Sequence, residues 1–69
     1  MLVKINTQKL IEKREKAGLS RNQLSAKAGL SNNAVFRMEC KEYRVSDLRA
    51  KTVADVLGCR LNEIVLREV

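Results

Sequence analysis

The chain has 69 residues, so we expect one small domain with its own core and no separate effector domain. Hydrophobic residues make up 45% and charged residues 32%, a balance that favours a folded chain over a disordered one. Only 3% of the residues are aromatic and proline is absent, so packed aliphatic helices are favoured over a β-sandwich or barrel.

The net charge of +6 favours a polyanionic partner, and this charge is unevenly distributed along the chain. Residues 1–44 contain ten basic and four acidic side chains, whereas residues 45–69 contain four of each. The whole positive excess therefore lies in the first two thirds of the sequence, which strengthens the indication of a nucleic-acid partner.

Several classes of protein are disfavoured by what the sequence lacks. Cys40 and Cys59 are too few for a disulfide scaffold, and without histidine a zinc site lacks ligands. No general base accompanies a nucleophile, and no glycine-rich phosphate loop is present, so we expect no enzymatic activity and no cofactor. With no signal peptide or membrane span, we expect a cytoplasmic protein with free thiols and no membrane association.

The first two predicted helices are defined by their caps and stops. The first has Asn6 or Thr7 as its cap and ends before Gly18, and the apolar residues between them recur at helical spacing. Ser20 and Gln23 form a capping-box pattern that begins a second helix of about eight residues. The stripe of the first helix is formed by Thr7, Leu10, Ile11, Arg14 and Ala17.

A third helix is expected over about residues 32–40, with Ser31 as its cap. Its inner stripe contains Val35, Met38 and Glu39. Its outer face contains Asn32, Asn33, Phe36, Arg37 and Cys40.

The remaining third of the chain is interpreted as scaffold. Residues 41–45 lack a period and are predicted to form a charged loop, after which Ser46 caps a fourth helix that ends at Gly58. Asn62 is the expected cap of a last short helix. The alternation around Val3 and Ile5 predicts a terminal strand that pairs with residues 66–69. The expected fold is a single all-α domain over residues 1–69, a compact bundle of about five helices with a short terminal β pairing.

Residues 18–31, GLSRNQLSAKAGLS, continuing from Val35 to Glu39, closely resemble the helix-turn-helix motif of the phage repressor and Cro family, also called the xenobiotic response element (XRE) family. Glycines, caps and apolar positions fall in register over residues 10–65. The resemblance implies a lambda repressor-like fold and a transcriptional regulator, most simply a repressor, encoded by a bacterium or phage. The chain departs from the family pattern at Arg21, Ser25, Lys41 and Val45, where the family usually has glutamine, alanine, glycine and proline.

The outer face of the third helix is predicted to contact bases in the major groove. Asn32 and Asn33 are poor helix formers, but asparagine can bind adenine. Arg37 can bind guanine, and Phe36 can cover a thymine methyl group. The alternative is that these are solvated first-turn residues, a rim aromatic and a surface charge. Their grouping at the start of a recognition helix favours base contacts.

Phosphate contacts are implied by the resemblance, which places the start of the second helix and the loop after the third helix on the DNA backbone. The alternative is a solvated charged loop, which is strongest for Glu42 and Lys27. The implied set is Arg21, Asn22, Ser31, Lys41, Tyr43 and Arg44.

Arg14 and Glu39 stand on apolar stripes, and neither can be buried without a partner. We therefore expect them to pair, and the resemblance implies a bridge beneath the recognition helix.

One recognition helix reads few base pairs, so a homodimer on a palindromic double-stranded operator is expected. The terminal segments, with Leu2, Leu66 and Val69, are the predicted dimer surface. One alternative is that the termini are frayed and the protein dimerises only on DNA. Another is a protein-binding module, such as an antitoxin that uses the same fold to cap a toxin.

Overall fold

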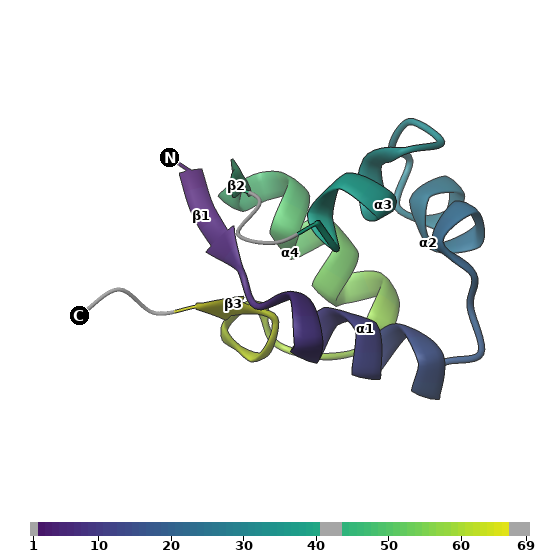
Figure 1. The fold of residues 1–69 in the computed structure, drawn as a ribbon, viewed down its shortest axis with the longest axis horizontal. Helices are drawn as coiled ribbons and strands as arrows, with labels where there is room; N and C mark the ends of the chain where they lie inside the picture. Colours follow the sequence, from purple (N-terminus) through teal and green to yellow (C-terminus); the bar gives the residue numbers. More distant parts are fainter. Residues whose placement is uncertain (1, 41–43, 67–69) are drawn as a thin grey trace.

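The computed structural model describes residues 2–40 and 44–66. Within these residues the fold is mostly helical, as predicted, but it contains four α-helices rather than about five (Figure 1). The last expected helix is a single 3₁₀ turn, and the sheet has one strand more than the sequence indicates. In chain order the elements are β1 (Leu2–Ile5), α1 (Thr7–Lys16), α2 (Arg21–Lys27), α3 (Ala34–Met38), β2 (Arg44–Ser46), α4 (Asp47–Leu57), η1 (Leu61–Glu63) and β3 (Val65–Leu66).

Helices α1 and α2 begin where the sequence predicts because side chains satisfy their free backbone N–H groups. The Asn6 side chain accepts a hydrogen bond from the backbone N–H of Lys9 at 3.2 Å. At the start of α2, Ser20 Oγ accepts from the Gln23 N–H at 3.1 Å, and Gln23 Oε1 accepts from the Ser20 N–H at 2.8 Å. The predicted capping box is confirmed.

Helix α4 also has the predicted ends, whereas the element that follows it begins differently. Ser46 caps α4 by accepting from the Arg49 N–H at 3.3 Å, and Gly58 ends it in the left-handed conformation with φ 69°. The prediction that Asn62 caps the last helix is wrong. Arg60 takes that position, and its N–H donates to the carboxylate of Glu63 at 2.7 Å.

Helix α3 is shorter than the expected helix over residues 32–40. It begins at Ala34, because the two asparagines of low helix propensity form a turn before it. Ser31 is not the cap of α3. Asn33 stands at the N-cap position without a capping side-chain bond, and Ser31 contributes only its carbonyl, which accepts from the Ala34 N–H at 3.0 Å.

The three strands form one antiparallel sheet with the order β2-β1-β3. The predicted pairing of the terminal segments is present, with Ile5 opposite Val65 and Lys4 opposite Leu66. Val69 lies outside the described residues. Strand β2 corrects the prediction of a loop over residues 41–45, because Val45 pairs with Val3 across the sheet. A three-residue strand is too short to show alternation in sequence, and only its partner defines it.

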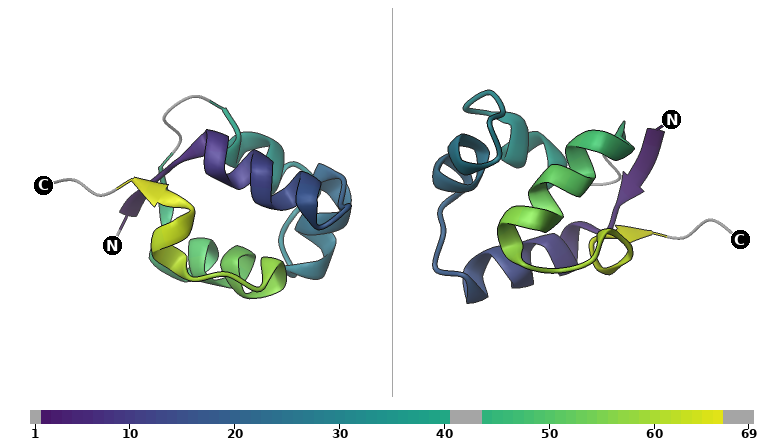
Figure 2. Two further views of the ribbon diagram at one scale, coloured as in Figure 1. Left: turned by 90° about the horizontal axis from the view of Figure 1, so that it is seen from below. Right: turned by 180° about the vertical axis from the view of Figure 1, so that it is seen from behind.

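The core lies between the helices and the inner face of the sheet, with α1 and α4 on opposite sides of the bundle (Figure 2). The sheet occupies one end of the molecule and α2 the other (Figures 1 and 2). No helix among the described residues combines the length and apolarity needed to cross a membrane. The most deeply buried large apolar side chains are Ile5, Leu10, Leu24, Val35, Met38, Val53 and Ile64.

An ion pair connects α1 with η1 on the surface. Lys13 Nζ lies 3.2 Å from Glu63 Oε1. The N–H of Arg60 and then Lys13 lower the pKa of Glu63, because both stabilise the carboxylate. Burial, followed by the nearby Glu63 carboxylate, raises the pKa of Cys59. Cys59 is therefore less readily ionised than an ordinary thiol, and both it and Cys40 are free cysteines.

Candidate nucleic-acid interface

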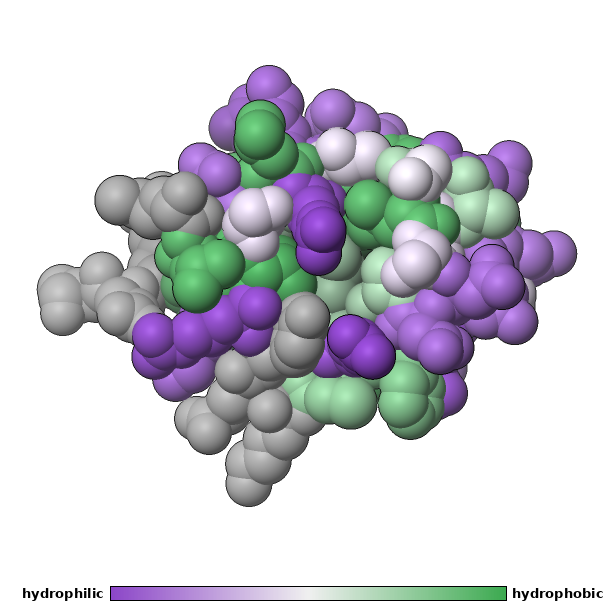
Figure 3. Space-filling model, turned by 90° about the horizontal axis from the view of Figure 1, so that it is seen from above, coloured by the Kyte–Doolittle hydropathy of each residue, from purple (hydrophilic) through white to green (hydrophobic). Residues whose placement is uncertain are grey.

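Helices α2 and α3 pack against each other across a short turn, so that α3 has one buried and one exposed side. Gly29 allows the turn by adopting a left-handed φ of 71°. Val35 and Met38 anchor α3 in the core, whereas Phe36 is 51% exposed and Arg37 also faces solvent. In the space-filling view from above, hydrophilic residues cover much of the end where α2 lies (Figure 3).

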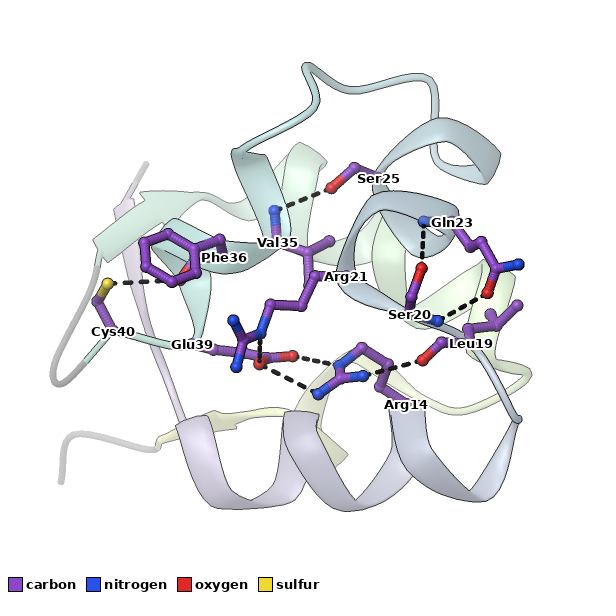
Figure 4. Close-up of polar contacts among 10 residues, drawn as sticks. All are labelled: Arg14, Leu19, Ser20, Arg21, Gln23, Ser25, Val35, Phe36, Glu39 and Cys40. Atoms are coloured by element: carbon purple, nitrogen blue, oxygen red, sulfur yellow. Dashed lines mark hydrogen bonds and ion pairs between the residues drawn. The ribbon is translucent and has the colours of Figure 1, made fainter.

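A serine of α2 supplies the cap that α3 lacks locally. Ser25 is fully buried, and its hydroxyl accepts a hydrogen bond from the backbone N–H of Val35 at 3.1 Å (Figure 4). Val35 is the second residue of α3, so its N–H has no partner within the helix. The departure from alanine at Ser25 thus fixes the start of α3 against α2.

A buried ion pair connects α1 with the end of α3. Arg14 Nε lies 2.6 Å from Glu39 Oε2, and Arg14 Nη1 donates to the carbonyl of Leu19 at 2.9 Å (Figure 4). The side chains of Arg14 and Glu39 are only 12% and 4% exposed. The structure thus joins the two charged residues that the sequence analysis expected to pair.

Arg21 is a second partner of the same carboxylate. Its Nε donates to Glu39 Oε1 at 3.0 Å, and its Cζ lies 5.2 Å from the centre of the Phe36 ring (Figure 4). The Arg21 side chain is 49% exposed, so it covers the buried pair from the solvent side. Sequence reasoning missed this cluster, and the only signal was the arginine at a position where the resemblance leads one to expect glutamine.

An open hollow of about 410 Å³ lies over this cluster, between the start of α2 and the outer face of α3. Four residues of the predicted DNA-contacting sets meet there. The hollow is lined by Arg14, Ser20, Arg21, Asn22, Asn33 and Phe36.

A family model described as helix-turn-helix matches residues 10–64, which is most of the chain. The chain belongs to the XRE (phage repressor and Cro-like) helix-turn-helix family. Members of this family are DNA-binding transcriptional regulators, and this chain is of that kind. A search of curated proteins returns no significant match. Helices α2 and α3 form the motif, in which α3 holds the position of the recognition helix.

In this helix-turn-helix protein the other predicted site residues are more scattered. Ser31 and Asn32 are exposed in the turn before α3, and Lys27 is exposed at the end of α2. Arg44 lies in β2, opposite Lys4 of β1, and is therefore part of the sheet rather than of the hollow. Two predicted phosphate-contacting residues, Lys41 and Tyr43, lie outside the described residues.

Proposed function

We propose that this helix-turn-helix protein is a repressor that binds a specific double-stranded DNA sequence with α3 in the major groove. One observation carries the proposal: α3 buries its apolar side and exposes side chains that suit base edges. Two of the exposed side chains lie in the turn before α3 and two on its outer side, and a major groove is wide enough to admit an α-helix. These side chains are Asn32, Asn33, Phe36 and Arg37.

Each of these side chains has a chemical counterpart on a base. The amides of Asn32 and Asn33 can donate to N7 and accept from N6 of adenine. Arg37 can donate two parallel hydrogen bonds to O6 and N7 of guanine, and Phe36 can contact the methyl group of thymine.

The phosphate contacts are proposed for residues outside this base-contacting set, because such contacts position the duplex without reading it. The resemblance also implies a phosphate contact for Arg21, but in the structure its guanidinium contacts Glu39 and Phe36 instead. The remaining proposed set is Asn22, Ser31 and Arg44, together with Lys41 and Tyr43 outside the described residues.

The direct test is selection of bound sites from a pool of random duplex DNA, followed by titration of the selected site against a scrambled duplex of equal length. We expect the selected site to bind at least on the order of 10³-fold more tightly. Equal affinity for both duplexes would contradict the proposed function.

Arg37→Ala is expected to lose discrimination at one base pair of the selected site, at a cost of about 1–3 kcal/mol. The reason is that alanine cannot donate the paired hydrogen bonds to guanine. The measurement is a set of dissociation constants for duplexes that differ at single base pairs. Arg49→Ala, at an exposed arginine of α4, is the control. An Arg37→Ala protein with the parent's full set of preferences would count against the assignment.

We further propose that the protein acts as a homodimer through the sheet end of the molecule, on a palindromic operator with half-sites about 34–36 Å apart. Leu2 is 65% exposed and Leu66 is 42% exposed, although both belong to strands. Leu48 is 74% exposed and lies two residues after Ser46, which pairs with Leu2 in the sheet. Three exposed leucines around one small sheet are unfavourable in water and favour a second copy as their cover.

Leu66→Lys is expected to shift the protein from dimer to monomer at micromolar concentration, because burial in the interface would remove the lysine ammonium group from water without a counter-ion. Sedimentation velocity measures this change. Gln8→Lys adds the same charge at an exposed position of α1 and should leave the dimer intact. A monomeric parent protein, or a dimer unaffected by Leu66→Lys, would exclude this interface.

A further inference from the structure

The contacts of Arg21 differ from those of a residue that only touches the DNA backbone. Arg21 is the first residue of α2, yet its side chain reaches across to α3 and is held there from two directions. Glu39 binds its Nε at 3.0 Å, and the Phe36 ring lies beneath its guanidinium at 5.2 Å. The ion pair and the ring together restrain a side chain that is otherwise among the most flexible.

These two contacts leave the end of the guanidinium available. The carboxylate uses Nε, and within the described residues neither Nη1 nor Nη2 of Arg21 has a hydrogen-bond partner. The two terminal nitrogens of the planar guanidinium form the fork that recognises a pair of acceptors side by side. In the major groove, O6 and N7 of guanine are such a pair.

The position of Phe36 decides between a base and a phosphate as the target. The separation of 5.2 Å between the Arg21 guanidinium and the Phe36 ring is less than half of the major groove's width of about 12 Å. If Phe36 enters the groove, the guanidinium that lies on it enters as well. A phosphate can be bound by a mobile positive charge as well as by a planar fork, whereas discrimination of a base needs the fork held in place.

We infer that Arg21 is a specificity-determining residue that reads a guanine from α2, with Phe36 as the aromatic residue that positions it. The inference rests on the proposed function and extends it, because base recognition then comes from both helices of the motif. It also gives Phe36 a second task, since its ring supports Arg21 and the residue, 51% exposed, can still meet a thymine methyl group.

The test uses the full chain and the selected operator, with a series of duplexes in which each G·C pair is replaced in turn. Arg21→Lys keeps the charge but removes the planar fork. We expect it to lose a preference of roughly 10- to 100-fold at one G·C pair and to keep its preferences elsewhere. Each preference is a ratio of two dissociation constants of the same variant, so a partly unfolded preparation does not affect it.

Phe36 is tested through the same base pair. Phe36→Leu should weaken the preference at that base pair, whereas Phe36→Tyr should retain it because the ring remains. The double variant with Phe36→Leu and Arg21→Lys should lose no more of this preference than Arg21→Lys alone. Arg60→Lys, at an exposed arginine before η1, is the matched control and should change nothing.

Two outcomes would overturn the inference. A uniform loss of affinity for all duplexes with Arg21→Lys would make Arg21 a backbone contact while leaving the proposed function in place. A Phe36→Leu protein with the full preference at the Arg21 base pair would remove the positioning role. If the parent protein itself discriminates between no sequences, the proposed function fails and the inference fails with it.

Discussion

Glu39→Met is expected to lower the free energy of unfolding by about 3–5 kcal/mol, a large part of the roughly 5–15 kcal/mol available to a small domain. The substitution removes the carboxylate that neutralises Arg14, whose side chain is only 12% exposed, and leaves a desolvated cation without a counter-ion. Urea unfolding followed by circular dichroism measures the change, with the slope of the transition checked for constancy.

Because Arg14 and Arg21 share the carboxylate of Glu39, substitutions of the three residues should lower the free energy of unfolding by different amounts. Arg14→Met should cost less than Glu39→Met, because Arg21 continues to bind Glu39 at 3.0 Å. Arg21→Met should cost least, since the Arg21 side chain is half exposed and leaves the buried pair intact. A Glu39→Met protein as stable as the parent, or an Arg14→Met protein that is less stable than Glu39→Met, would contradict this order.

DNA binding is expected to weaken by on the order of 10²- to 10³-fold between about 50 and 200 mM salt. If two or three cationic side chains of each protomer neutralise phosphates, a dimer releases about four to six counter-ions, and the slope of log K against log salt is roughly −4 to −5. Fluorescence anisotropy with a labelled operator at a series of salt concentrations measures this slope.

Arg44→Gln should make the slope shallower by about two for a dimer, because one phosphate contact is lost from each protomer. Lys51→Gln removes the same charge from an exposed position of α4 and should leave the slope unchanged. A parent protein whose affinity is independent of salt would show that phosphate neutralisation does not drive its binding.

Features that depend on neighbouring residues could be predicted from the sequence. The capping box of Ser20 and Gln23 and the stop at Gly58 involve residues a few positions apart, so their spacing is informative. The pairing of β1 with β3 could also be predicted, because the alternation around Val3 and Ile5 leaves one apolar face that needs a cover.

Features that depend on distant residues could not be predicted in the same way. Strand β2 exists only because Val45 meets Val3, and the start of α3 depends on a hydroxyl ten residues earlier. Arg21 is 18 residues from Glu39, a separation that has no periodic signal. The Arg14–Glu39 pair could be predicted only because both charged residues lie on apolar stripes, where a buried charge needs a partner.

The hydroxyl of Ser25 has a consequence for the order in which the motif assembles. Helix α3 has five residues, no local cap, and an amide at Val35 that is satisfied only from α2. A helix of this length is unstable in isolation, because the cost of nucleation is not recovered in so few turns. The recognition helix therefore forms only on a completed α2, and the two helices gain and lose their structure as one cooperative unit. Hydrogen exchange at the Val35 amide is accordingly expected to require separation of the two helices.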